Sequence, residues 1–169
     1  IGSGLYVYDL KSKALKHFVK STDTQSLSYN HVTKVFQDRK KRIWVLTNGG
    51  GINLFQKESQ SFRVFTVKDG LASNTVRGVV EDGHGDLWYT TTNGISKMDG
   101  NTLRFINFEE ADGLQGKEFI AKAFTSNAQN WLFFGGVNGL NYLKSDSLRM
   151  RLDVPDVYVT SFKLFNQEV

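Results

Sequence analysis

Two stretches of this chain decide its fold: NHVTKVFQDRKKRIWVLT at residues 30–47 and NTVRGVVEDGHGDLWYTT at residues 74–91. Each begins with an Asn, alternates apolar and polar residues up to an Asp, turns, and continues into an apolar run that holds a Trp. All three markers are separated by 44 residues, in the pairs Asn30 and Asn74, Asp38 and Asp82, and Trp44 and Trp88. A common spacing at three positions indicates an internal repeat.

A glycine followed by an apolar residue extends the repeat in both directions. The segments GLYVY, GINLF, GISKM and GLNYL begin at Gly4, Gly51, Gly94 and Gly139, with spacings of 47, 43 and 45 residues. The last copy is divergent, because WLFFGG at residues 131–136 replaces the Trp-x-x-Thr run. Phe133 then stands at the Trp position.

Each unit is expected to form four short strands, near residues 31–37, 43–47, 51–55 and 62–65 in the first full copy. Asp38 suits the turn after the first strand, because its carboxylate can accept hydrogen bonds from nearby backbone N–H groups. Asn48 and the two glycines after it suit the next turn, which requires positive φ. Four strands in 43–47 residues is the size of a β-propeller blade.

We therefore predict an all-β chain in which residues 1–150 form propeller blades, each a four-stranded antiparallel sheet, in a partial ring. Stacking blades around an axis buries both apolar faces of each sheet, with the Trp wedged between neighbours. The count is about three and a half blades: half of one (2–19), two complete (30–66 and 74–108) and most of a fourth (117–145). The alternative is a β-sandwich with accidental regularity, which has no reason to repeat Trp and Gly.

The predicted ring is incomplete, so we expect the chain to be an excised part of a longer protein whose missing blades lie upstream. A partial ring exposes edge strands and an apolar sheet face. We expect such a piece to associate with other chains or to aggregate. The missing blades of the parent chain are thus its first expected partner.

Composition excludes several classes of function. The chain is 40% hydrophobic and 22% charged with a net charge of +4, which is typical of a soluble globular protein. It has no cysteine, so disulfides and thiolate chemistry are excluded. No apolar run approaches the ~20 residues of a membrane span. The richest charge run, residues 38–42, falls at an expected turn, so we expect no nucleic-acid binding in this region.

No catalytic constellation emerges, and we expect no cofactor, no metal and no catalytic residue. The histidines His17, His31 and His84 fall in different blades without metal-ligand spacing. Glu109, Glu110 and Asp112 cluster, but such a run is typical of a solvated loop. Asp38 and Asp82 recur at equivalent turns, so we assign them to the fold, together with Trp44, Trp88, Gly51, Gly94 and Gly139.

Candidate ligand residues follow from blade geometry. Propeller ligands meet one face or the central mouth, which the loops entering the first strand and joining the second to the third would build. Arg77 and Lys122 hold places equivalent to Thr33 on the innermost strands, where they either reach the channel mouth or are satisfied in the core. The predicted ligand-binding residues are Arg77, Lys122, Asn74, Asn93, Asn48 and His31. Side chains of these types suit sugar hydroxyls, although they also suit strand ends.

The repeat resembles the regulator-propeller repeat of hybrid two-component sensors from polysaccharide-degrading gut bacteria. The matching pattern is Asn-x-Val-x-x-Val-x-x-Asp, then Ile/Leu-Trp-x-x-Thr, then Gly-Ile, carried by Asn74, Val76, Val79, Asp82, Leu87, Trp88, Thr91, Gly94 and Ile95. The last copy resembles the final blade of that family. Residues 151–169 resemble the linker and first strand of the small β-sandwich, of the Y-Y-Y type, that follows such propellers.

The resemblance implies the periplasmic sensor region of an inner-membrane hybrid histidine kinase. Such a region senses an oligosaccharide, works as a homodimer and controls polysaccharide-utilisation genes. The membrane helix, kinase, receiver and DNA-binding domains that the family implies lie outside this sequence. Two alternatives stay open: an enzymatic propeller, such as a lyase or glycosidase, and a protein-interaction propeller without a small ligand.

Overall fold

The fold is all-β, as predicted. The computed structural model describes residues 2–147, 163–164 and 167–168. The main strands are β1 (Leu5–Tyr8), β2 (Leu15–Phe18), β3 (Val32–Gln37), β4 (Ile43–Thr47), β5 (Ile52–Gln56), β6 (Ser61–Phe65), β7 (Val76–Glu81), β8 (Leu87–Thr91), β9 (Ile95–Met98), β10 (Phe105–Phe108), β11 (Phe119–Ser126), β12 (Trp131–Gly136) and β13 (Gly139–Lys144). Two 3-10 turns connect successive sheets, η1 (Val67–Asp69) between β6 and β7 and η2 (Glu110–Asp112) between β10 and β11, and a third, η3 (Ser145–Ser147), follows β13.

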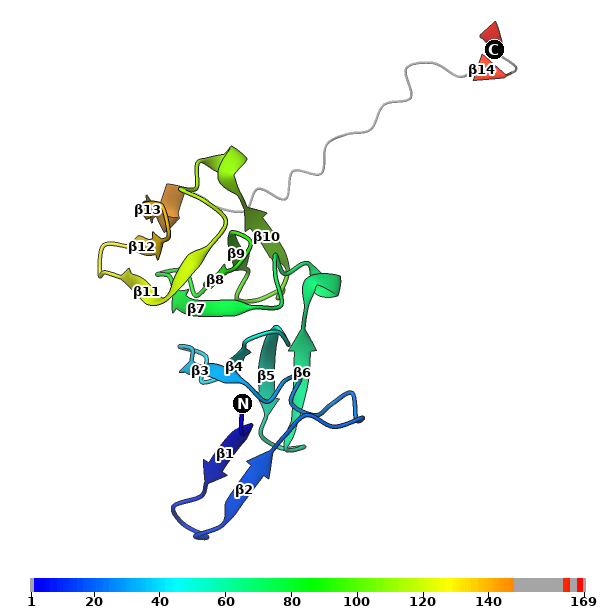
Figure 1. Ribbon diagram of the computed structural model, residues 1–169, viewed down its shortest axis with the longest axis vertical. Helices are drawn as coiled ribbons and strands as arrows, with labels where there is room; N and C mark the ends of the chain where they lie inside the picture. Colours follow the sequence, from blue (N-terminus) through cyan, green and yellow to red (C-terminus); the bar gives the residue numbers. More distant parts are fainter. Residues whose placement is uncertain (1, 148–162, 165–166, 169) are drawn as a thin grey trace.

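The strands form successive antiparallel sheets of the blade type. Two sheets have four strands, in the orders β3-β4-β5-β6 and β7-β8-β9-β10, while β11-β12-β13 has three and β1-β2 has two. The prediction of four-stranded antiparallel blades is confirmed for the two central units. Figure 1 shows the β1–β2 sheet beside β3–β6, and β7–β10 between β3–β6 and β11–β13.

The predicted opening strand of a β-sandwich falls mostly outside the described residues. Its described parts are β14 (Lys163–Leu164) and β15 (Gln167–Glu168), which pair as a short antiparallel hairpin. The division at residue 150 therefore stays a prediction.

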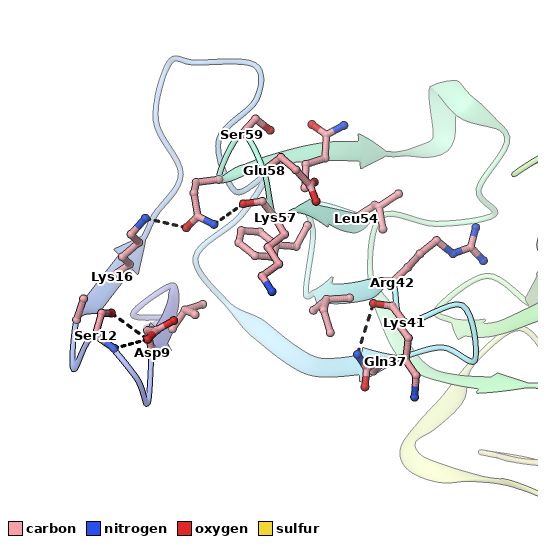
Figure 2. Close-up of a pocket in the computed structure, with 16 residues that line it drawn as sticks. Asp9, Ser12, Lys16, Gln37, Lys41, Arg42, Leu54, Lys57, Glu58 and Ser59 are labelled. Atoms are coloured by element: carbon pink, nitrogen blue, oxygen red, sulfur yellow. Dashed lines mark hydrogen bonds between the residues drawn. The ribbon is translucent and has the colours of Figure 1, made fainter.

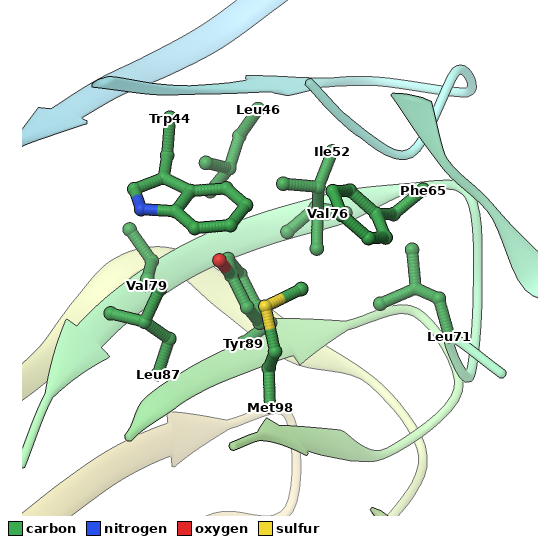
Figure 3. Packing of buried hydrophobic residues seen from close by; sticks show 10 residues of the cluster. All are labelled: Trp44, Leu46, Ile52, Phe65, Leu71, Val76, Val79, Leu87, Tyr89 and Met98. Carbon is green, nitrogen blue, oxygen red and sulfur yellow. The ribbon is translucent and has the colours of Figure 1, made fainter. Parts of the chain in front are cut away.

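The core lies between neighbouring sheets. One cluster fills the space between β3–β6 and β7–β10 (Figure 3), and contains Trp44, Leu46, Ile52, Phe65, Leu71, Val76, Val79, Leu87, Tyr89 and Met98. A second cluster joins β7–β10 to β11–β13, and contains Val80, Trp88, Ile95, Phe119, Leu132 and Phe134. Burial on both faces explains why β4 and β8 read as continuous apolar runs. The repeated Trp thus packs between blades, as the spacing indicates.

A hydrogen bond within each central blade fixes the Trp. Trp44 Nε1 donates to Asp38 Oδ2 at 2.8 Å, and Trp88 Nε1 donates to Asp82 Oδ2 at 2.9 Å. In both turns, the second carboxylate oxygen accepts a backbone N–H from the residue four positions later, Arg42 for Asp38 and Asp86 for Asp82. Both Asp side chains are buried. The recurring Asp therefore satisfies a buried indole N–H and closes the turn.

Asp38 makes the stability of this turn pH-dependent. Burial opposes its ionisation, but hydrogen bonds from Trp44 and Arg42 outweigh burial and hold the pKa of Asp38 below its usual value. A depressed carboxyl pKa contributes stability that is complete above the unfolded value, about 3.9, and is lost as the pH falls through the folded value. Acid should therefore weaken the Asp38–Trp44 turn.

Asp38→Asn is expected to lower the free energy of unfolding at pH 7 by about 1.5–3 kcal/mol, the contribution of hydrogen bonds to a charged group. The difference from wild type should begin to shrink below about pH 3.9, where the unfolded chain takes up the proton, and should vanish once the pH falls below the lowered pKa of folded Asp38. Chemical denaturation followed by Trp fluorescence at pH 7 and pH 3 measures it. Glu58→Gln, at an exposed turn, is the matched control. A difference that stays equal at both pH values would contradict the role of the ionised form.

The recurring glycine connects one blade to the next. Gly4, Gly51 and Gly94 adopt φ values of 81°, 77° and 88°. Their N–H groups donate to carbonyls of the segment that enters the following blade, at 2.7–2.9 Å: Asn30 O, Asn74 O and Lys117 O respectively. The Thr that precedes two of these glycines, Thr47 or Thr91, donates its hydroxyl to the glycine carbonyl at 2.9 Å. The Trp-x-x-Thr and Gly-Ile elements therefore form one inter-blade turn.

The two end sheets expose apolar faces. On β1–β2, Tyr6 and Tyr8 lie on one face and are 55% and 52% exposed. On β12–β13, Tyr142 is 64% exposed and stacks on Phe133, the residue at the Trp position. In the two central blades, the equivalent faces are covered by a neighbouring sheet, and Trp44 and Trp88 are buried between the sheets. The expectation that the chain associates through them stays a prediction.

Candidate functional site

The innermost strand of each of three sheets is irregular at one point. The register shifts between Val32 and Lys34 on β3, and between Val76 and Gly78 on β7. On β11 it shifts between Phe119 and Phe124. A bulge leaves an extra residue without a ladder partner and turns its side chain away from the regular direction. Three sheets therefore present irregular backbone toward a common space.

The extra residues are the three that the repeat aligns. Thr33 and Arg77 lie inside the first two shifts, and Lys122 lies inside the third with φ of 68°. Thr33 and Arg77 each stand one residue before a position that pairs with the second strand, since Lys34 pairs with Leu46 and Gly78 pairs with Thr90. The bulges thus place these side chains at one level of three neighbouring blades.

These side chains border one cavity of about 410 Å³, which we name the inner cavity. Its walls come from β3, β7 and β11, and consist of Thr33, Lys34, Arg77, Ala121, Lys122 and Phe124. The structure therefore brings the predicted residues Arg77 and Lys122 together, on two adjacent blades.

Thr33 has a structural part in this cavity. Its hydroxyl lies 3.2 Å from Leu46 O in its own sheet and 3.3 Å from Val76 O in the next sheet. The equivalent Arg77 and Lys122 side chains make no hydrogen bond or ion pair with the described part of the chain. Thr33 therefore links two blades, whereas the cationic groups of Arg77 and Lys122 are available to contact a ligand.

Phe124 and Lys34 form the aromatic wall of the inner cavity. A Cβ added to Gly78 would lie 2.0 Å from the Phe124 ring, so the glycine is what lets this ring pack against β7. Lys34 Nζ lies 4.1 Å from the centre of the same ring and 3.5 Å from Val79 O. A cation at this distance from a ring face is attracted to it. Burial lowers the pKa of Lys34.

Lys34 lines the inner cavity, but the sequence pattern does not predict it as a site residue. Regular alternation along β3 puts Lys34 on the side opposite Thr33, so its side chain gives no signal of its own. The bulge at Thr33 breaks this alternation and brings both side chains to the same cavity. The repeat aligns Lys34 with Gly78, whose missing side chain leaves space for the Phe124 ring. This alignment is the one sequence signal that points to Lys34.

The other predicted ligand residues lie elsewhere. His31 and Asn48 border a separate cavity of about 350 Å³ with Lys20 and Tyr29, and His31 Nδ1 lies 3.3 Å from Asn48 Nδ2. Asn74 Oδ1 accepts the Val67 N–H at 2.9 Å. Exposed Asn93 donates its amide to Ala72 O at 3.3 Å. The six residues therefore divide between two cavities and two loop-capping positions.

A hollow of about 1110 Å³, larger than the inner cavity, has a different character (Figure 2). It lies between the β1–β2 turn, which holds Asp9 and Ser12, and the segment 54–60 of the next blade. Among the described residues, strand β1 pairs only with β2, whereas its counterparts β5 and β9 pair on both sides. The hollow thus borders an unpaired strand edge, and we interpret it as space for a strand, not for a small ligand.

Two kinds of feature are not found in the described residues. No three His, Asp or Glu side chains there gather closely enough to hold a metal ion. No helix within those residues is long and apolar enough to cross a membrane.

Residues 26–49 match the family described as the two component regulator propeller. These residues are a regulator-propeller repeat. The resemblance inferred from the Asn, Asp and Trp pattern is thereby confirmed.

A curated relative of this chain is a much longer protein. Histidine kinase P4 from Formosa agariphila is 26% identical over 147 residues, which are 87% of this chain and 11% of that protein. The chain therefore spans about a ninth of the curated relative that it matches. The chain is accordingly similar to one segment of a histidine kinase.

Solved structures agree on the fold. The extracellular domain of the putative hybrid two component system BT4673 from B. thetaiotaomicron matches with a TM-score of 0.65 and 21% identity, covering 83% of this chain and 20% of that one. A second structure, described as the extracellular domain of the putative one component system BT4673, has a TM-score of 0.67, 19% identity and coverage of 85% and 20%. At these identities the likeness establishes the fold.

Proposed function

We propose that this regulator-propeller chain is part of the periplasmic sensor region of a hybrid two-component histidine kinase and that it helps to bind an oligosaccharide. The observation that carries the proposal is the inner cavity, in which bulges on three neighbouring blades direct Thr33, Arg77 and Lys122 to one place. The likeness of the blades to extracellular domains of two-component systems supports the location.

The lining of the inner cavity suits a sugar. Arg77 offers several N–H donors in a fixed plane, which match pairs of sugar oxygens. The Phe124 ring offers an apolar face against which the C–H groups of a pyranose pack. A volume of about 410 Å³ lies within the usual range for small-ligand sites, roughly 300–1,000 Å³.

Signalling needs more than binding. A ligand shifts a conformational equilibrium only if it binds the two states with different affinity. We propose that the inner cavity meets this condition, because its walls belong to three separate sheets, so a ligand bound there would depend on how those sheets pack. We propose that the ligand alters how blades pack, that a homodimer transmits the change across the membrane, and that the kinase then controls polysaccharide-utilisation genes.

The test is a thermal-shift screen of the full extracytoplasmic region against neutral and acidic oligosaccharides. Ligand at ~100 times its dissociation constant should add about 2.7 kcal/mol of stability. Arg77→Ala should abolish or strongly reduce the shift, whereas Arg104→Ala, at an exposed position beside the outer strand β10, should leave it unchanged. A shift that Arg77→Ala does not affect would place the ligand elsewhere. An oligosaccharide that binds but is consumed would indicate a lyase or glycosidase, and silence across the panel would favour a protein-interaction propeller.

A further inference from the structure

The inner cavity carries positive charge without a counter-charge in its walls. Three of its six lining residues are cationic, Lys34, Arg77 and Lys122, and none is acidic. Like charges that share a small space repel each other, more strongly where water is partly excluded. Such an arrangement is expected to attract an anion.

The acidic residue on the same strand does not supply that anion. Glu81 stands at the other end of β7, and its carboxylate accepts the backbone N–H of Arg39 at 2.9 Å. The buried Asp38 is engaged with Trp44 and Arg42. Within the described residues, the ion pairs of the chain involve Arg42, His84, Lys97 and Lys144, and none involves the inner cavity.

The three cations differ in what they can do. Lys34 is held by the Phe124 ring and Val79 O, so its charge is fixed in place and partly shielded from water. Burial of the Lys34 ammonium also lowers its pKa. Arg77 is half-buried and Lys122 exposed, and both lack a partner in the described chain. Arg77 and Lys122 are thus placed to contact a ligand, while Lys34 strengthens the positive field around them.

We propose that the inner cavity binds the anionic group of an acidic oligosaccharide, a carboxylate or a sulfate, through Arg77 and Lys122, with the sugar ring against Phe124. The inference deepens the proposed function and rests on it. Arg77 can hold two oxygens of such a group at once, and Lys122 can neutralise the remaining charge. Recognition of the charge, and not of hydroxyls alone, would then set the class of sugar.

The experiment compares matched probes on the full extracytoplasmic region by isothermal titration calorimetry. The probes are maltotetraose as a neutral sugar, tetragalacturonate and a sulfated carrageenan tetrasaccharide as acidic sugars, and sodium sulfate as a free anion. We expect an acidic tetrasaccharide to bind at least tenfold more tightly than maltotetraose, with affinity that falls as salt rises from 50 to 500 mM because screening weakens charge contacts.

Variants assign the effect to the inner cavity. Arg77→Gln and Lys122→Gln should each weaken binding of the acidic sugar by about tenfold or more, since charge-assisted hydrogen bonds are lost. Lys122→Arg should retain most of the affinity, and Arg104→Gln should retain all of it. Circular dichroism and the melting temperature without ligand identify any variant that fails to fold. Substitution of Lys122 should disturb folding least, because its side chain is exposed to solvent.

The outcomes separate this inference from the proposed function. Maltotetraose that binds as tightly as the acidic sugars, or acidic binding that Arg77→Gln and Lys122→Gln leave unchanged, overturns the inference and leaves the sensor proposal intact. Sulfate that binds as tightly as the acidic sugars identifies a site for a free anion and also overturns it. No binding by any probe contradicts both.

Discussion

Asp86→Ala is expected to lower the free energy of unfolding by about 3–5 kcal/mol, the usual cost of removing one partner from a buried ion pair. Asp86 Oδ2 lies 3.0 Å from Lys97 Nζ, and the Lys97 side chain is only 2% exposed. Asp86 Oδ1 also accepts the Gly100 N–H at 2.9 Å, so the substitution loosens a turn as well. The ammonium of Lys97 stays buried beside the Trp88 ring but loses this carboxylate. Chemical denaturation followed by fluorescence measures the loss.

The neighbouring blade supplies a matched rescue. Arg42 in that blade is equivalent to Asp86. The Arg42 carbonyl accepts the backbone N–H of Asp38, just as the Asp86 carbonyl accepts that of Asp82. Leu54 stands at the position of Lys97, because each pairs with the repeated Trp. The same two sites thus hold an acid and a base in one blade and a base and an apolar residue in the other.

The double variant Asp86→Arg with Lys97→Leu should therefore recover most of the stability that Asp86→Arg alone loses. Asp86→Arg alone places two cations together and should be the least stable of the set. Lys97→Leu alone should cost less, because Asp86 keeps Gly100 and is more exposed than Lys97. Losses that simply add in the double variant would show that the two sites are energetically independent.

The sequence predicted the blade scaffold closely, because the features that define a blade are local. The expected strand at 43–47 is β4, and the expected first strand at 31–37 is β3 within one residue. Phe133 stands at the Trp position as the spacing indicated, since Asn127 accepts the Trp131 N–H as Asp38 accepts that of Arg42. Turn residues, alternation and spacing suffice for such features.

Side-chain direction at the candidate site could not be predicted in the same way. Their loop positions predict Asn74 and Asn93 as ligand residues, yet both side-chain amides bond to the backbone of neighbouring loops. Strand alternation directs Lys34 away from Thr33, whereas the bulge between Val32 and Lys34 brings both side chains to the inner cavity. Bulges and long-range amide contacts depend on the neighbouring blade, which no single repeat encodes. The ligand roles of Arg77, Lys122, His31 and Asn48 stay predictions.

Gly94→Ala is expected to be nearly as damaging as loss of the buried ion pair, through the backbone. Gly94 has φ of 88°, where an L-residue costs about 1–2 kcal/mol. A Cβ there would lie 2.3 Å from Phe108 O, which is a backbone atom and cannot move aside alone. Such an overlap adds about 1–3 kcal/mol. Since Gly94 N–H also donates to Lys117 O at 2.7 Å, relief of the clash would separate two blades.

Gly139→Ala provides the matched control for this prediction. Gly139 opens the last copy of the repeat with φ of 139°, but a Cβ there meets no atom within 4 Å among the described residues. Only the backbone preference is then lost, so Gly139→Ala should lower the free energy of unfolding less than Gly94→Ala. If the two variants lose equal stability, backbone strain alone explains the repeated glycine. If Gly94→Ala loses more, as expected, the glycine recurs because it lets consecutive blades approach closely enough to exchange a backbone hydrogen bond.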